Sequence, residues 1–171
     1  MMKALFVDIQ DIKKKSIISG SLDADKMLQF VEVAQDTHIQ NYLGGKLYKK
    51  IQQLIIDDEI SNAGNENYKY ILETYIQPML IWFTQATFIP FSLYTINNGG
   101  MYKHISENGQ LVDKEEMLMI EQKCKDTADF YTRRFVDYMC RNSNQFPEYT
   151  TASEEDMHPD RDVNYRGGWY V

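Results

Sequence analysis

The longest apolar stretch of the chain, from Asn67 to Asn98, has the pattern of a helix that is buried on nearly every side. One face recurs at helical steps of three and four, and further apolar residues fill most other directions. The first set is Tyr68, Leu72, Tyr75, Met79, Phe83, Ala86 and Thr87, and the second is Ile71, Ile76, Leu80, Trp82, Phe88 and Phe91. Polar residues interrupt the run before the roughly 18 apolar residues that a membrane span needs. Because Pro78 and Pro90 each remove an amide donor, we expect one helix kinked twice, or two helices that meet near Pro78.

Three shorter helices are predicted before this stretch. Asp8 is placed to cap a helix from Ile9 to about Lys15, and Asp23 a helix from Ala24 to about Leu43. The second helix has an inward stripe of Met27, Leu28, Val31, Ala34, Gln35, His38, Ile39 and Tyr42. Gly44-Gly45 predicts a helix stop, and a third helix follows from Lys46 to about Ile60, with Leu47, Ile51, Leu54 and Ile55 facing the core.

After the apolar stretch, a hairpin and a last helix are predicted. Asn97-Asn98-Gly99-Gly100 breaks the helix, and residues 101–112 contain an Asn108-Gly109 pair typical of a two-stranded hairpin. Asp113 and Glu116 form a capping box that opens a helix running to about Arg141. Helical periodicity then stops. The predicted fold class is all-α: a bundle of four substantial helices over residues 1–144, with the small β-hairpin inserted at 101–112, and an extended C-terminal tail over residues 145–171.

Charge and cysteine usage restrict the function. The 171 residues carry a formal charge of -7 and no basic block, which disfavours a protein that grips nucleic acid by its phosphates. Six acidic and two basic side chains in residues 145–171 place -4 of this charge in the tail. Cys124 and Cys140 are expected on one helix about 24 Å apart, too far for a disulfide, which indicates a reducing compartment. The first residues lack the pattern of a secretion signal, so we expect synthesis in the cytoplasm.

No candidate catalytic or metal site has the residues that its chemistry requires. His38 lies on the inward stripe of the second helix, and His104 has no second histidine or cysteine nearby. Glu155 and His158 match a Glu-x-x-His spacing, but they lie in the aperiodic tail, where Pro159 disfavours a helix. The acidic run 57–59 is typical of a solvated helix end. We therefore predict a protein that is not an enzyme and has no cofactor, with catalytic and metal residues both none.

Two segments have features that suggest binding to a partner. The hairpin would project between two long helices and offer Met101, Tyr102, His104, Asn108 and Gly109 as a partner or channel loop. The tail is acidic in its middle and aromatic at its two ends, and aromatic residues in a solvated segment are typical anchors on a partner surface. These predicted partner-binding residues are Phe146, Tyr149, Tyr165, Trp169, Tyr170 and Val171.

Three stretches resemble the head–tail connector proteins of tailed bacteriophages, the adaptor or first-ring proteins beneath the portal. They are VEVAQDTHIQNYLGGKLYKKI (31–51), YIQPMLIWFTQATFIPFSLYTINNGG (75–100) and ADFYTRRFVDYMCRNSNQFPEY (128–149). They are similar to the amphipathic helix that ends at Tyr-Leu-Gly, the long proline-containing helix, and the closing helix of that family. The likeness is greatest to the versions in phages of gut Bacteroidetes, including crAss-like phages.

The resemblance implies a structural virion protein at the phage neck. Copies would form a ring, expected to match the twelvefold portal, that extends the DNA channel and joins head to tail. Its partners would be other copies, the portal and the next tail or ring protein, while DNA passes through without specific binding and no membrane is involved. The alternative is an intracellular helical adaptor or regulatory subunit with no virion role. A further option is an enzyme that uses His38 or His104 in a bundle pocket.

Overall fold

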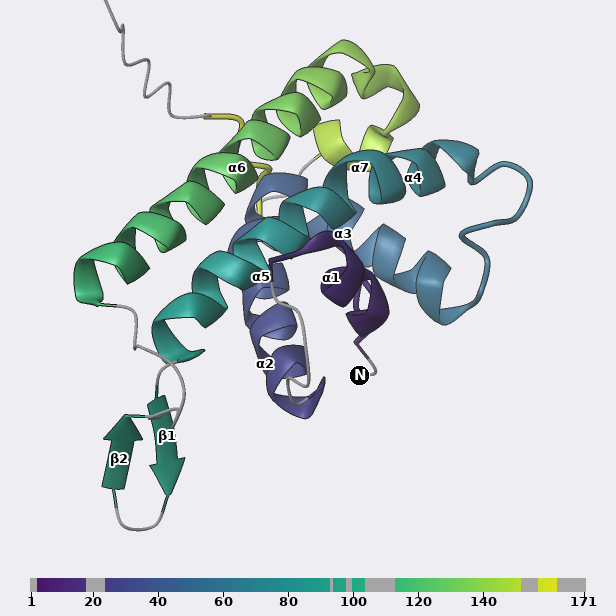
Figure 1. Cartoon of the computed structure of the whole chain (residues 1–171). Helices are drawn as coiled ribbons and strands as arrows, with labels where there is room; N and C mark the ends of the chain where they lie inside the picture. The colour runs from purple at the N-terminus through teal and green to yellow at the C-terminus, as the bar shows by residue number, and fades with distance from the viewer. Residues whose placement is uncertain are drawn as a thin grey trace, which may run out of the picture.

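The computed structural model contains four substantial helices packed around one core, which confirms the predicted mostly helical class (Figure 1). It describes residues 3–17, 24–92, 94–97, 100–103, 113–151 and 157–162. Its α-helices are α1 (Ile9–Lys15), α2 (Ala24–Ala34), α3 (Gln40–Ile56), α4 (Glu66–Ile71), α5 (Gln77–Ser92), α6 (Lys114–Arg141) and α7 (Pro147–Thr150). Two π-helical turns, η1 (Gln35–Ile39) and η2 (Leu72–Ile76), join α2 to α3 and α4 to α5, and η3 (Ser143–Gln145) is a 3-10 turn.

The central helix is α5, which is buried on nearly every side as its pattern predicts. Leu72, Met79 and Phe83 are all buried. The turn η2 lies directly before Pro78, and there the Gln77 N–H donates to the carbonyl of Leu72, five residues back. A helix that widens in this way leaves room for the proline ring, so the chain continues through Pro78 into α5 and does not separate into two distant helices.

Helix α6 packs along α5 over much of its length (Figure 1). The predicted capping box is present: the Asp113 side chain accepts from the Glu116 N–H, and the Glu116 side chain accepts from the Asp113 N–H. Cys124 and Cys140 both lie on this one helix and both are free thiols, as expected.

The predicted helix stop at Gly44 is a sharp break inside a longer helix. Gly44 has φ +74° and ψ 163°, and the helix resumes immediately and ends at Ile56, four residues before the predicted end at Ile60. Asp8 caps α1 as predicted, since its side chain accepts from the Gln10 N–H. Asp23, the predicted cap of α2, lies outside the described residues.

The strand pairing differs from the predicted hairpin. Strands β1 (Tyr94–Asn97) and β2 (Gly100–Lys103) run antiparallel, with Tyr94 opposite Lys103 and Asn97 opposite Gly100, and they project beyond the end of α5 (Figure 1). Asn97 and Gly100, the first and last residues of the predicted helix breaker, are thus paired across the two strands. The predicted turn at Asn108-Gly109 is not shown, because residues 104–112 lie outside the described residues.

The N-terminal segment before α1 has no regular secondary structure, buries Phe6 and Val7, and is held by glutamine side chains. The fully buried Gln35 accepts from the Phe6 N–H at 2.8 Å and donates to the Ala4 carbonyl at 2.9 Å. Gln77 donates to the Phe6 carbonyl at 3.0 Å. These bonds satisfy backbone groups that have no partner in a helix or sheet, which a buried chain requires.

The start of the predicted tail belongs to the core, which corrects the prediction that Phe146 and Tyr149 bind a partner. Phe146 is 0% exposed and Tyr149 1% exposed. The Phe146 ring lies edge-on to Tyr68 at 5.6 Å, and that of Tyr149 edge-on to Phe135 at 6.2 Å. Pro147 starts the short helix α7 between them, and this turn directs both rings inward.

Candidate functional site

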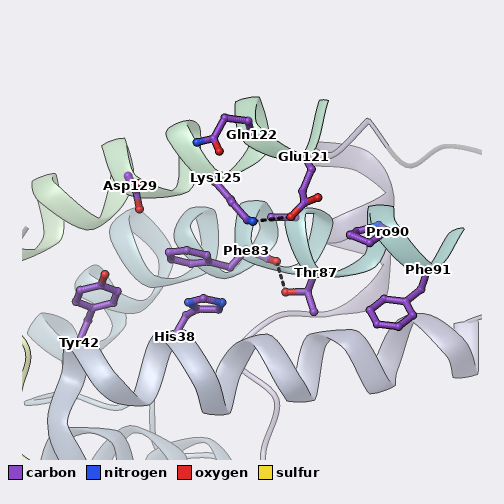
Figure 2. Close-up of a pocket in the computed structure, with 11 residues that line it drawn as sticks. His38, Tyr42, Phe83, Thr87, Pro90, Phe91, Glu121, Gln122, Lys125 and Asp129 are labelled. Atoms are coloured by element: carbon purple, nitrogen blue, oxygen red, sulfur yellow. Dashed lines mark hydrogen bonds and ion pairs between the residues drawn. The ribbon is translucent and has the colours of Figure 1, made fainter. Parts of the chain in front are cut away.

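A groove of about 620 Å³ lies between the helix that runs from α2 through η1 to α3, helix α5 and helix α6 (Figure 2). We call it the three-helix groove. The α2–α3 side contributes His38 and Tyr42, and α6 contributes Glu121, Gln122, Lys125 and Asp129. Its floor is α5, with Phe83, Ala86, Thr87, Pro90 and Phe91.

Three aromatic rings line one end of the groove in nearly parallel orientation. The His38 and Phe83 rings stack with their centroids 4.0 Å apart and their planes at 3°. The Tyr42 ring lies 6.5 Å from Phe83 at 18° (Figure 2). Parallel ring faces of this kind bind flat apolar groups well, because offset stacking adds to the energy of burial.

The opposite wall is a charged row on α6. Glu121, Lys125 and Asp129 recur every fourth residue, so they share one face of the helix. Lys125 forms an ion pair with Glu121. Burial lowers the pKa of His38, and the nearby Lys125 charge lowers it further. The pKa of Tyr42 is raised by burial, and the carboxylates of Asp129 and Asp160 add to the shift. Both side chains are therefore held in their neutral forms at neutral pH.

The C-terminal residues 157–162 dock beside this groove at the Gly44 break. In an unbroken helix the Gly45 N–H would donate to the Asn41 carbonyl. Instead, the Gly45 N–H donates to the Met157 carbonyl, and the Asp160 N–H donates to the Asn41 carbonyl, both at 2.9 Å. The break thus frees one donor and one acceptor, and the C-terminal segment satisfies both of them.

Arg161 holds the docked segment to the core from its other side. Its guanidinium lies 5.1 Å from the centre of the Tyr149 ring, and it donates to the Tyr149 carbonyl at 3.3 Å. Residues 157–162 of the predicted extended tail are therefore attached to the helical core.

Residues 39–157 match a protein family of unknown function, DUF6712. The chain belongs to this family. The matched region includes the Gly44 break and ends at Met157, so it contains both partners of the Gly45–Met157 hydrogen bond. No curated protein and no solved structure matches the chain.

Of the two histidines that the structure of this DUF6712 chain describes, His38 and His158, the first lines the groove. His158 is exposed, and Glu155 of the same spacing lies outside the described residues. His104, Asn108, Gly109, Tyr165, Trp169, Tyr170 and Val171 also lie outside them, and for Met101 and Tyr102 the structure describes the backbone only. Asp57, Asp58 and Glu59 are exposed at the end of α3.

The described ranges of the DUF6712 chain contain no group of three metal-ligating side chains. Within the same ranges, no helix is long and apolar enough to cross a membrane. Sequence reasoning missed the three-helix groove, although the four-residue spacing of Glu121, Lys125 and Asp129 was visible. It also interpreted Gly44-Gly45 only as a stop. The groove thus carries aromatic rings on the wall opposite α6 and side chains of both charges on the α6 wall.

Proposed function

We propose that this DUF6712 protein is a structural subunit of a phage head–tail connector. Copies form a ring, twelvefold like the portal, that extends the DNA channel and joins the portal to the next tail or ring protein. The protein is made in the host cytoplasm, acts in the virion neck, and needs neither catalysis nor a cofactor. The family resemblance of the three sequence stretches motivates this role, and one feature of the structure supports it most directly.

That feature is a set of large apolar side chains exposed at one end of the molecule, which we call the apolar end. Phe91 is 58% exposed, Leu118 48% and Met119 54%, and Tyr94, three residues after Phe91, is exposed as well. The elements that carry them are the end of α5, β1 and the first turns of α6, which lie together where the β1–β2 pair projects (Figure 1). Exposed apolar residues gathered in this way are typical of protein–protein interfaces.

The charge of the chain is also consistent with a channel protein. A formal charge of -7 would not retain passing DNA, whereas a basic lining would bind its phosphates. This argument favours the role without specifying which helix faces the channel.

The test is the assembly state of the full chain, alone and with portal protein, measured by light scattering and by electron microscopy of any rings. We expect a ring or a portal-dependent assembly, and Leu118→Ser combined with Met119→Ser, neither of which lines the three-helix groove, should abolish it. The matched control is Tyr70→Ser, which changes an exposed aromatic residue on α4. A chain that stays monomeric with portal and binds one cellular protein instead would favour the alternative, an intracellular adaptor or regulatory subunit.

A further inference from the structure

We propose that the C-terminal segment Tyr165–Val171 binds in the three-helix groove of its own chain, with its aromatic rings against His38, Tyr42 and Phe83. This inference does not depend on the proposed connector role, because it concerns the free polypeptide. The groove would then be occupied by the chain's own C-terminal segment. The aromatic residues of that segment, Tyr165, Trp169 and Tyr170, are those predicted from the sequence to bind a partner.

The first argument is the place where the described chain ends. The segment from Met157 to Asp160 pairs with Gly45 and then with Asn41, so it runs back along the helix toward Tyr42 and His38. The Asp160 carboxylate is close enough to Tyr42 to affect its ionisation. The last described residues therefore lie at the Tyr42 end of the groove.

The second argument is length. Residues 163–171 can span up to about 30 Å when extended. The groove wall from Asp129 to Glu121 is eight residues of helix, or about 12 Å at 1.5 Å per residue. The segment can therefore follow the groove to its far end with residues to spare. Gly167-Gly168 permits the turn that would direct Trp169 and Tyr170 toward the floor.

The third argument is chemical complementarity. Arg166 is the one charged side chain in residues 163–171, and the α6 wall, with Glu121 and Asp129 against Lys125, carries a net negative charge. Three of these nine residues are aromatic, and they would meet the nearly parallel rings of the opposite wall. A cation beside a wall of net negative charge is a favourable contact, and so is an aromatic ring on the face of another ring.

The fourth argument favours the same chain over a second copy. Backbone hydrogen bonds at Gly45 and Asn41 already attach the segment's start within a few residues of the groove. A short tether of this kind raises the effective concentration of the segment to about the millimolar range. At micromolar protein, a segment from a second copy would therefore be outcompeted.

The test is photocrosslinking in the full chain with a benzophenone amino acid at position 169. We expect the crosslink to map by mass spectrometry to residues 38–42, 83–91 or 121–129 of the same chain, with a yield that does not change over a tenfold range of protein concentration. A crosslink to any other surface would overturn the proposal. So would a crosslink found only in covalent dimers, since the occupant would then be a second copy.

Groove occupancy is tested by Thr87→Trp, which fills the floor, against Thr127→Trp as the matched control. Both threonines donate to the carbonyl four residues back at 2.8 Å, and Thr127 does not line the groove. Thr87→Trp should reduce the crosslink several-fold and Thr127→Trp should leave it unchanged. Equal yields in the two variants would contradict the proposal.

A second measurement covers the case in which Thr87→Trp fails to fold. A synthetic peptide of residues 163–171 is added to the otherwise unaltered crosslinking chain. Excess peptide should lower the intramolecular crosslink, and its Trp169→Ala form should compete about 30-fold less well, as expected for a hot-spot side chain. If both peptides compete equally or neither competes, the groove does not bind this segment.

Discussion

Pro159 packs directly against Gly44, and only a glycine fits at that position. A Cβ atom built on Gly44 would lie 2.7 Å from the Cγ and Cδ atoms of Pro159. The Gly44 backbone, at φ +74° and ψ 163°, is in a region that is essentially restricted to glycine. The glycine at the helix break therefore leaves space for Pro159. The docked C-terminal segment in turn satisfies the backbone groups that the break leaves without a helical partner.

Gly44→Ala should destabilise the protein through both backbone strain and this contact. The backbone cost alone is about 1–3 kcal/mol. Gly64→Ala is the control, because Gly64 has φ +96° with no atom within 4 Å of a built Cβ. In urea unfolding we expect the Gly44 variant to lose more stability than the Gly64 variant, and Pro159→Ala should recover part of the difference. Equal losses in the two glycine variants would show that Pro159 does not press on Gly44.

Phe83→Ala should lower the free energy of unfolding by about 3–5 kcal/mol, because it leaves a cavity in the core and removes the ring that stacks on His38. Phe83 is 4% exposed, whereas Phe91, two turns further along α5, is 58% exposed. Phe91→Ala should therefore cost much less than Phe83→Ala, because the exposed Phe91 ring loses mainly its contact with Phe30. Chemical denaturation of the two variants measures the contrast. A loss below about 1 kcal/mol for Phe83→Ala would refute this packing of α5.

Phe146→Ala should destabilise the free chain by about 3–5 kcal/mol, since the ring is fully buried against Tyr68. If Phe146 only anchored a partner, its substitution would leave the melting temperature of the free chain unchanged. Phe130→Ala is the control, because Phe130 is 54% exposed on α6. Thermal unfolding of the purified variants distinguishes a core residue from an interface residue.

His38 should make stability depend on pH in the acidic range. Burial and the Lys125 charge lower its pKa in the folded state below the ordinary 6.5. The folded state then binds fewer protons than the unfolded state, so stability rises with pH in this window. The stability that the neutral His38 ring contributes should be complete above about pH 6.5. It should be lost as the pH falls from there through the lower pKa of His38 in the folded state. Unfolding curves of the native chain and of His38→Phe, which keeps a stacked ring, measure the difference. Parallel pH profiles would exclude His38 as the cause.

Gln35→Leu should cost about 1–3 kcal/mol, because it leaves the Phe6 N–H without its side-chain acceptor and removes one of the two glutamine donors, Gln35 and Gln52, to the Ala4 carbonyl. Gln53→Leu provides the comparison, since Gln53 bonds only to Asp57 on the surface. Hydrogen exchange at the Phe6 amide gives a local readout. We expect faster exchange there in the Gln35 variant, and unchanged protection would show that the segment is held by other contacts.

Local sequence determined the elements whose signals lie within one turn of helix. The Asp8 cap and the Asp113–Glu116 capping box are satisfied between residues two or three apart, and both are present where the sequence predicts them. The burial of α5 on nearly every side could also be predicted from the sequence, because a helix with apolar residues in every direction is buried in a core. The π-helical turn that precedes Pro78 is consistent with the amide donor that proline lacks.

Only the tertiary structure decided the contacts between residues far apart in the chain. No local pattern indicates that Gln35 would hold Phe6, or that the groups freed at Gly44 would bind residues 157–160. Phe146 and Tyr149 follow a loss of helical periodicity that favours a solvated tail, yet the core had room for both rings. The three-helix groove is formed where α2–α3, α5 and α6 meet, which no single segment of the sequence specifies. The reason is physical: helix periodicity specifies which face is buried, whereas the partner of that face is selected by packing against the rest of the chain.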